Sequence, residues 1–568
     1  MELKTIFSKN EHKPIIGSDF DGVVTEGIIP ERGTIILTGK SKDEEEEMRE
    51  LLPNKNRIVF FPNPEELTDK NKDKKIGQWK AEKIAEFGVG KFYEDNQTQA
   101  KIIQEYNPAV EVIHVKNEEK KDDGKLKFFI ISGFGELLDI AIQLEKVEKY
   151  ETIFYVSDPD FNRIGDGIVT KDDKWHNYIG KGYIWIIDGC EQADLQDWLR
   201  DQGEYVVGTN KIMADYENNR QKGQELFKKA GFYQPFSKNF TNIEECLQFV
   251  EKHLDKKYIL KQNGDLPKSV NHKAHFEDNI DLIFHLNELK KTWSETNIGK
   301  FDCDLMECVS GMEVAVSAFF NGNDFLRDKD GKVVGFINHE QKKACDGDLG
   351  STTGEMGTLF NGVDEDDKLF KDIMMKPEIV KVLKDSNYRG AFDINCIVTD
   401  DGIVGLEPTS RFGIPATSYE FIEAMESGTG HLLATMAMGE DNPIRITKGW
   451  GIVQVIVSMP FPIEADLEET ATSLGEKLWI IKDEKAIDDF TKNQLKHIHL
   501  ENFKKTDNGD YIVATKSGYL LTITGTGKDI ADCREKMLEY IKENIYISDF
   551  WFRQDLGKNV EKYYDTRK

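Results

Sequence analysis

The chain has 568 residues, more than one hydrophobic core usually supports, so we expect roughly three or four domains. The formal net charge of −28 argues against non-specific binding to the backbone of nucleic-acid polymers, although one basic pocket for a phosphorylated small molecule is compatible with it. The first residues lack the apolar centre of a signal peptide, and no run approaches about 18 apolar residues, so we expect a cytoplasmic protein without a membrane partner. The seven cysteines show no CxxC spacing, which argues against a zinc site or a disulfide framework.

The first part of the chain alternates short apolar runs with helical stretches. Such alternation is typical of a parallel sheet in an α/β domain. A polar run over Lys116–Lys125 follows and predicts a linker or a long surface turn, so we place the first domain boundary there. The predicted strands lie at 13–21, 33–40, 56–62, 89–96 and 110–116, and the predicted helices at 77–88 and 97–106.

Polar residues gather at the ends of these predicted strands. Asp19 and Asp21 follow the first apolar run and precede a glycine, so both should lie at the carboxyl edge of the sheet, where open parallel sheets bind ligands. A turn with two solvated acids is the alternative interpretation of this pair alone. Three further elements favour a site: Thr38 ends the second run, Lys80 lies in the first helix, and Glu94 and Asp95 end the fourth run.

This ordered set resembles the motifs of the haloacid dehalogenase-like (HAD-like) phosphatase superfamily over roughly residues 12 to 116. The resemblance implies a Rossmannoid HAD-like phosphatase domain over 1–116, with Asp19 as the nucleophile that takes the phosphoryl group and Asp21 as the acid/base. It also implies that Thr38 and Lys80 hold the phosphate, and that Asp95 completes a Mg²⁺ site with Asp19. A carboxylate nucleophile meets an anionic phosphate only where cations offset the repulsion, and these residue types supply that arrangement.

After the linker the α/β pattern resumes. Residues 126–146 predict a strand, a glycine turn and a helix, and the pattern continues to about Thr209. The stretch 212–232 then predicts one long helix that Gly231 ends. Beyond this helix, strands mixed with acidic turns indicate a second composition and therefore a different α+β domain.

A glycine-rich loop over 345–357 has almost nothing apolar to bury. Glycines let backbone N–H groups approach a ligand closely, and the hydroxyls of Thr352 and Thr353 can complete a cradle for an anion or a carboxylate. A flexible surface loop would have a similar composition, so the loop alone does not identify a site.

The segments around this loop carry acids on predicted strands. Glu307 ends one strand, and Glu313 follows after a turn. Residues 388–415 predict a hairpin that places Asp393 and Glu407 on adjacent strands. Paired acids at this spacing suit Mg²⁺ bound to nucleotide phosphates. Arg411 follows Glu407 and can stabilise negative charge that develops during a reaction. Two solvated acids on the strands are the alternative interpretation.

Residues 127 to 560 resemble an ATP-grasp ligase, and more closely the glycinamide ribonucleotide synthetase family, also called phosphoribosylamine–glycine ligases. The resemblance covers the turn "ISGFGE", the run "VVGTNKIMADYENNRQKGQELFKKAGF", the strand "MECVSGMEV", the loop "QKKACDGDLGSTTGEMG", the segment "GLEPTSRFG" and the tail "ISDFWFRQDLG". It implies a pre-ATP-grasp α/β domain over 126–209, an ATP-grasp domain over 210–440 and a small C-terminal α+β domain over 441–568.

The resemblance also implies roles for single residues. In the implied reaction, ATP phosphorylates a substrate carboxylate, an amine attacks the acyl phosphate, and an amide forms. The implied cofactor is Mg²⁺ (or Mn²⁺), and the small-molecule partners are ATP, an amino acid and phosphoribosylamine or a related nucleotide amine. A monomer or a dimer is expected. The matched residues are Lys261, Arg220, Glu307 and Glu313 for ATP; Lys342, Lys343, Asp348, Thr353, Gly354 and Gly357 for the substrate loop; Asp393 and Glu407 for the metal; and Arg411 for catalysis.

The chain departs from the family's pattern mainly on the acceptor side. Thr409 replaces an asparagine of the metal segment, and Asp393 can compensate for it. We therefore infer ATP-dependent ligation with a changed or relaxed amine, fused to a Mg²⁺-dependent phosphatase. The alternatives are an ATP-binding regulator of the phosphatase and an amino-acid ligase that acts on a modified nucleotide. The other departures are the residues 136–138 after the glycine turn, Ile414, Ala416, Gln341, and Arg220 in place of a lysine.

Overall fold

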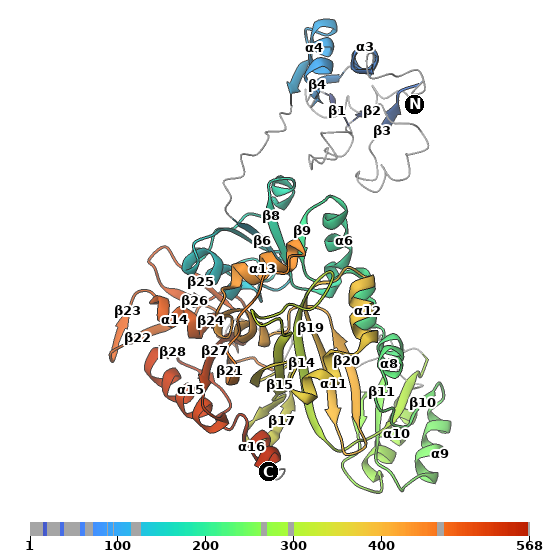
Figure 1. The fold of residues 1–568 in the computed structure, drawn as a ribbon, viewed down its shortest axis with the longest axis vertical. Helices are drawn as coiled ribbons and strands as arrows, with labels where there is room; N and C mark the ends of the chain where they lie inside the picture. Colours follow the sequence, from blue (N-terminus) through green and yellow to red (C-terminus); the bar gives the residue numbers. More distant parts are fainter. Residues whose placement is uncertain are drawn as a thin grey trace.

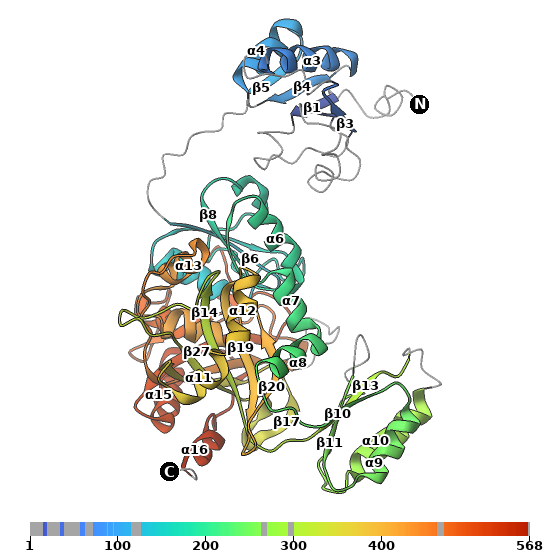
Figure 2. The ribbon, with the colours of Figure 1, turned by 45° about the vertical axis from the view of Figure 1, so that its right-hand side comes forward.

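The computed structural model describes residues 15–19, 35–38, 57–62, 72–87, 89–94, 96–114, 126–262, 270–293, 300–462 and 471–565. Figures 1 and 2 show the chain from two directions. In the ranges that are described, no helix is long and apolar enough to cross a membrane.

The first sheet has five parallel strands in the order β3-β2-β1-β4-β5. All five predicted strands are confirmed, and both predicted helices form. The helices α3 and α4 pack side by side, where Gly77 allows the close approach of Gln99. The bounds are β1 Ile15–Asp19, β2 Ile35–Thr38, β3 Arg57–Phe60, α3 Lys72–Phe87, β4 Val89–Glu94, α4 Gln97–Tyr106 and β5 Glu111–His114.

A second parallel sheet has the order β7-β6-β8-β9. The predicted strand, glycine turn and helix at its start are confirmed, because β6 leads through a turn into α5, which continues as a π-helix over Gln143–Val147. The bounds are β6 Lys127–Ser132, α5 Leu138–Ile142, β7 Glu151–Val156, β8 Tyr183–Ile187, α6 Ala193–Asp201 and β9 Tyr205–Val207.

The prediction of one long helix over 212–232 is wrong, because two helices form there: α7 Lys211–Asn218 and α8 Arg220–Lys229. Asn219 leaves the helical region and its side chain accepts from the Lys222 backbone N–H at 3.3 Å. Asparagine at this position competes with helix continuation by capping a new N-terminus, so the chain turns instead of running straight.

A small subdomain follows and has its own hydrophobic core (Figure 2). Its antiparallel sheet has the order β10-β13-β11-β12, and the amphipathic helices α9 and α10 pack together over it. The bounds are β10 Ser237–Phe240, α9 Ile243–Lys252, β11 Tyr258–Gln262, β12 His272–Lys273, α10 Ile280–Trp293 and β13 Cys303–Glu307.

The centre of the molecule is a nine-stranded antiparallel sheet in the order β20-β19-β14-β15-β18-β21-β27-β24, with β29 paired to β21 (Figure 1). The predicted hairpin of β19 and β20 is confirmed. The sheet runs across the predicted boundary at residue 440, since β18 pairs with β21. The strand bounds are β14 Met312–Asn321, β15 Val334–Glu340, β18 Gly357–Asp364, β19 Arg389–Val398, β20 Ile403–Thr409, β21 Gly449–Ser458, β24 Ile498–Leu500, β27 Tyr519–Gly527 and β29 Phe550–Trp551.

The remaining elements surround this sheet. One hydrophobic core joins the second parallel sheet to it, with Phe128, Phe360 and Leu521 among its members. The helices are α11 Lys368–Met374, α12 Pro377–Asp385, α13 Thr429–Met438, α14 Lys492–His497, α15 Ile530–Asn544 and α16 Lys558–Asp565, with a π-helix at Ser418–Glu423. The short strands are β16 Lys343–Cys345, β17 Leu349–Thr352, β22 Trp479–Lys482, β23 Lys485–Ile487, β25 Phe503–Lys505, β26 Tyr511–Val513 and β28 Ile545–Tyr546.

Candidate active site

Basic side chains from three separate elements meet between the small subdomain and the central sheet. Lys261 extends from β11, and its pKa is lowered, first by burial and then by the positive charges of Arg220 and Lys342. Glu407 and Glu313 act in the opposite direction on the same ammonium. The structure therefore brings together these five residues, which the sequence placed on separate segments, as a cationic centre with acids at its rim.

Lys342 is held between two carboxylates. Its Nζ lies 3.0 Å from Glu313 Oε1 and 2.9 Å from Glu340 Oε2, and these acids raise its pKa above the ordinary lysine value in spite of its burial. Glu307 lies farther out at the end of β13, where it pairs with Lys256 at 2.8 Å. Its charge is thus already engaged by a lysine that the sequence analysis did not single out.

The predicted acids of the hairpin share one face of the sheet. Asp393 pairs with Thr409 and Asn395 with Glu407 across β19 and β20, so all four side chains point to the same side. The Asn395 amide donates to the Thr409 hydroxyl at 3.4 Å. The side-chain amide of Asn395, on the neighbouring strand, therefore lies next to Thr409, the position at which the family pattern has an asparagine.

Asp393 is 7% exposed, and its Oδ1 has no hydrogen-bond partner among the described residues. Burial raises the pKa of this carboxyl well above its usual range, and the like charges of Glu420 and Glu340 raise it further, while Arg411 lowers it. A buried oxygen without a donor, facing further carboxylates, matches the hard oxygen ligands that Mg²⁺ prefers.

The acids do not form a complete metal cage by themselves. Over the described ranges, no group of three or more His, Cys, Asp or Glu side chains is arranged closely enough to hold an ion. Mg²⁺ in nucleotide sites is commonly held by one or two carboxylates plus substrate phosphates. Asp393 and Glu407 therefore fit a metal that arrives with its nucleotide.

Arg411 is oriented by an acid that sequence analysis missed. Its Nε donates to Glu217 Oε1 at 2.8 Å, and the Ser410 backbone N–H donates to Glu217 Oε2 at 2.7 Å. Glu217 belongs to α7, almost 200 positions earlier, so no local spacing could reveal the pair. This contact holds the guanidinium within electrostatic reach of both Asp393 and Glu136.

The glycine-rich loop is mostly a β-hairpin made of β16 and β17. Arg553, which is 2% exposed, donates to Asp348 Oδ1 at 2.9 Å and to the Lys343 carbonyl at 3.1 Å. The Gly347 N–H donates to Asp555 at 2.8 Å. The C-terminal tail therefore anchors the tip of the hairpin and already binds Asp348.

The rest of the loop divides into a closed and an open part. Thr353 bonds the Lys342 carbonyl through its backbone N–H at 2.8 Å and its hydroxyl at 2.9 Å. A Cβ at Gly357 would lie 2.5 Å from both Leu556 and the Val453 carbonyl, whereas one at Gly354 would meet open space. Lys343 reaches the Gly350 carbonyl at 3.3 Å.

The glycine turn after β6 is closed by an acid. The Gly133 N–H donates to Asp188 at 3.1 Å, Ser132 also donates to Asp188, and the Gly135 N–H donates to the Ser132 hydroxyl at 3.0 Å. Burial raises the pKa of the next residue, Glu136, to about 7, and the charge of Asp188 adds to this. Sequence analysis predicted the turn but not the acid that fills it.

The N-terminal sheet brings Asp19, Thr38 and Glu94 to its carboxyl edge, because each ends a parallel strand. Lys80 lies 2.7 Å from Glu94, and their side chains are 1% and 0% exposed. Asp21 and Asp95 lie outside the described residues. The predicted lysine and acid are thus joined in a buried pair, and Glu94 rather than Asp95 is the strand-end acid that the structure describes.

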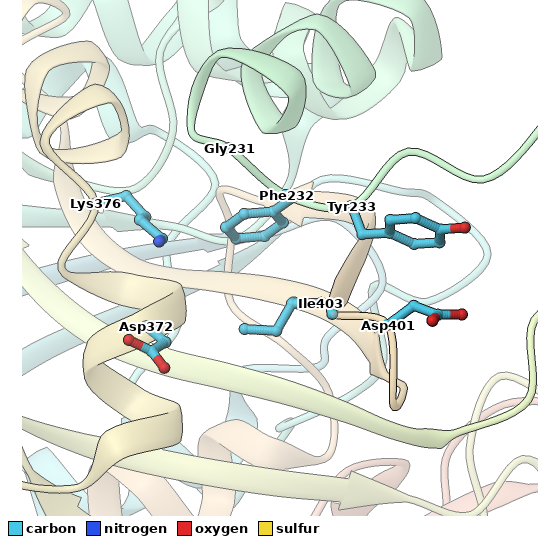
Figure 3. Close-up of a pocket in the computed structure, with 8 residues that line it drawn as sticks. Gly231, Phe232, Tyr233, Asp372, Lys376, Asp401 and Ile403 are labelled. Carbon is cyan, nitrogen blue, oxygen red and sulfur yellow. The ribbon is translucent and has the colours of Figure 1, made fainter.

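A cavity elsewhere holds none of the predicted residues (Figure 3). It lies between α8, α11 and the turn of the β19–β20 hairpin. Figure 3 shows the charges of Lys376, Asp372 and Asp401 around its rim without a common focus. We assign no chemistry to this cavity, which is lined by Gly231, Phe232, Tyr233, Asp372, Lys376, Asp401, Gly402 and Ile403.

Known proteins are similar to this chain over the region that holds the candidate active site. Residues 219–417 match the family model described as phosphoribosylglycinamide synthetase, ATP-grasp (A) domain. A phosphoribosylamine–glycine ligase of Methanocaldococcus jannaschii is 24% identical over 399 residues, which is 66% of this chain and 82% of that protein. The corresponding ligase of Lactococcus lactis is 20% identical over 387 residues, covering 66% of this chain and 81% of that protein.

Solved structures agree on the fold. Phosphoribosylamine–glycine ligase from Thermotoga maritima superposes with a TM-score of 0.54 at 19% identity, covering 76% of this chain and 100% of that one. The biotin carboxylase domain of 2-oxoglutarate carboxylase from Hydrogenobacter thermophilus, solved with ADP and bicarbonate, has a TM-score of 0.50 at 13% identity over 75% and 92%. The chain therefore carries an ATP-grasp fold that resembles the phosphoribosylamine–glycine ligases, with its ATP-grasp domain over residues 219–417.

Proposed function

We propose that this protein is an ATP-dependent carboxylate–amine ligase. The observation that carries the proposal is the meeting of Lys261, Arg220 and Lys342 opposite the hairpin acids Asp393 and Glu407. Lysine and arginine suit the negative phosphates of a nucleotide, and the acids suit the divalent cation that travels with them.

The proposed reaction has two steps. The γ-phosphoryl group of ATP passes to a carboxylate oxygen of the donor substrate, and ADP is released. The nitrogen of the acceptor amine then attacks the acyl carbon, the C–N bond forms, and the C–O bond to phosphate breaks as phosphate leaves. Arg411, oriented by Glu217, would stabilise the negative charge that develops in both steps.

Mg²⁺ or Mn²⁺ would be held by Asp393 and Glu407 and would neutralise charge on the nucleotide phosphates. Lys261 is buried enough to have a depressed pKa, and the acids near it favour its charged form. It is suited to binding a phosphate oxygen as a point charge. The named relatives suggest glycine, or another amino acid, as the carboxylate substrate.

We further propose that residues 1–116 form a HAD-like phosphatase. The parallel sheet with Asp19, Thr38 and Glu94 at one edge, and the buried Lys80–Glu94 pair, support this proposal. In this assignment Lys80, which Glu94 holds in place, is the cation that would contact the phosphate. Asp19→Asn should abolish hydrolysis of p-nitrophenyl phosphate with Mg²⁺ and leave ATP-dependent ligation unchanged; hydrolysis that survives the substitution would refute the assignment.

The ligase is tested by ADP formation with ATP, Mg²⁺ and a panel of amino acids and amines, in the Asp19→Asn background to exclude phosphatase turnover. ADP released in proportion to an amide product supports the ligase. Tight ATP binding without turnover for any pair would instead favour the regulatory alternative, in which the ATP site controls the phosphatase.

A further inference from the structure

One side chain beside the proposed metal ligands has no role in the proposed function. Asn395 lies two residues after Asp393 on β19, so both side chains point to the same face of the sheet. In the register of the hairpin, Asn395 is directly opposite Glu407 on β20. The Cβ atoms of directly opposite residues in an antiparallel pair lie about 5 Å apart. Asn395 is therefore the neighbour of one acid along the strand and of the other acid across the hairpin.

A β-bulge sets the register at this point of the hairpin. Directly after Asn395, Cys396 pairs with Gly405, so Leu406 is the extra residue on β20. Gln224 of α8 donates to the carbonyls of Gly405 and Leu406 at 3.0 Å each. Bulges beside active sites determine where the neighbouring side chains point. The position of Asn395 against β20 is thus held by contacts that lie outside the site.

The Asn395 side chain uses only one half of its amide. It is 8% exposed, and its Nδ2 donates to Thr409 Oγ1 at 3.4 Å. Within the described ranges, no donor reaches its amide oxygen. Asp393 Oδ1, on the same face, also lacks a partner there. Two oxygens without donors therefore occupy neighbouring positions of one strand face, and amide and carboxylate oxygens are ligands that suit Mg²⁺ and Mn²⁺.

A neutral oxygen suits this face better than a third carboxylate would. Asp393 is buried, and the charges of Glu420 and Glu340 already oppose its ionisation. A further carboxylate would add to this repulsion whenever the cation is not bound. An amide supplies an oxygen ligand without that cost, and Asn395 places one opposite Glu407.

We propose that Asn395 is a ligand of the nucleotide-bound divalent cation, and that its amide oxygen joins the carboxylates of Asp393 and Glu407. The family pattern has an asparagine where this chain has Thr409. This chain keeps an amide on the same face but carries it on the neighbouring strand. The inference rests on the proposed ligase activity, and it assigns to the metal site a residue that the resemblance does not.

The test measures how strongly Mn²⁺ favours ATP binding to the full-length chain in the Asp19→Asn background. Calorimetry gives the ATP dissociation constant with Mn²⁺ and with a chelator, and the ratio of the two constants isolates the contribution of the metal. Asn395→Thr should lower this ratio by about tenfold and leave metal-free ATP binding unchanged, because only a metal ligand is lost. The control Asn323→Ala, at an exposed position, should keep the ratio.

An exchange variant sharpens the test. Asn395→Thr combined with Thr409→Asn swaps the two side chains, so the face keeps the same atoms and the amide moves to the strand position of the family pattern. We expect the exchange to recover most of the lost ratio. Thermal melts of the single and the exchange variant establish that each is folded.

The possible outcomes separate the inference from the proposed function. An unchanged ratio in Asn395→Thr would overturn the inference and leave the nucleotide site standing. A folded exchange variant that does not recover the ratio would overturn it as well. Equal losses of ATP binding with and without Mn²⁺ would show a structural role for Asn395 and count against the inference in the same way. If Mn²⁺ does not strengthen ATP binding in the parent, the proposed metal site is itself refuted, and the inference fails with it.

Discussion

The two halves of the candidate active site differ in the sign of the charge that they leave without a partner. On the nucleotide side, Lys261 and Arg220 come together with Lys342, and only Lys342 is already paired, with Glu313 and Glu340. On the acceptor side, Glu136 and Glu501 lie with other acids, and the nearby cations are already paired. The proposed nucleotide site thus gathers cations, whereas the neighbouring group gathers buried carboxyls whose pKa values are raised.

The two sides also differ in the elements that carry them. The strands and the hairpin that carry the nucleotide side keep the motifs that the sequence resemblance implied. The acceptor side is built from a turn, a loop before β18 and the ends of β24 and β27, which are free to change residue type without disturbing the sheet. The comparison can be tested by substitutions on either side.

The largest effect is expected from Lys261→Met. Loss of this ammonium leaves phosphate charge uncompensated in a buried site, so kcat/KM for ATP should fall by about 100-fold or more. ADP formation and calorimetric ATP binding check it. The surface lysine Lys290, paired with Glu244 on the small subdomain, provides the control Lys290→Met, which should be neutral. Equal effects of both substitutions would contradict the cationic centre.

Asp393→Asn should have opposite effects with and without ligand. Metal-nucleotide affinity should fall by about 10- to 100-fold, since a ligating oxygen loses its charge. The ligand-free protein should melt at a higher temperature, because the substitution removes a buried carboxyl that lies among like charges. Mn²⁺ binding in the presence of ATP, followed by electron paramagnetic resonance, measures the first effect, and calorimetric melting measures the second. A lower melting temperature would show that Asp393 is not a strained acid.

Gly357→Ala tests the strand that joins the two sides. The added methyl would lie 2.5 Å from the Val453 carbonyl and from Leu556, so the free energy of unfolding should fall by about 2 kcal/mol. Gly354→Ala is the matched control, because nothing lies near its Cβ position. Chemical denaturation of both variants checks the difference, and equal stability would mean that the loop relaxes freely.

The smallest effect concerns pH. Burial raises the carboxyl pKa of Glu136 to about 7 and that of Asp188 to about 6, so both retain protons in the folded state that the unfolded chain has released. Stability from these groups is therefore full below about pH 4 and falls as the pH rises toward 7. Glu136→Gln should flatten the upper part of that decline. A profile of unfolding free energy against pH that keeps its slope in this variant would exclude Glu136 as a contributor.

Local patterns predicted much of the framework. The five strands of the first sheet follow from apolar runs bounded by polar residues, and the β19–β20 hairpin follows from the turn around Gly402. The same patterns missed the break at Asn219, because the helical periodicity continues on both sides of it. The break depends on the Asn219 side chain, which caps the start of α8, and such a cap leaves the hydrophobic periodicity unchanged.

Contacts between distant segments decided the site. Glu217 meets Arg411 across almost 200 positions, and Arg553 reaches Asp348 across 205. Asp348 was predicted from resemblance as part of the substrate loop, and that role stays a prediction beside its contact with Arg553. No motif marked Glu501, since an acid in a short loop is an ordinary residue in isolation.

The resemblance to a known family supplied most of the lysines and acids that are candidates for ATP and metal. The sequence by itself determined the five strands of the first sheet, the glycine turn and the β19–β20 hairpin. Those features depend on neighbouring residues, whose propensities and spacing are local. Only the tertiary structure decided that Asp188 fills the glycine turn and that Glu501 is buried with neither carboxylate oxygen hydrogen-bonded among the described residues. The reason is physical: burial and electrostatic pairing depend on distances in space, which the folded chain sets and sequence spacing does not.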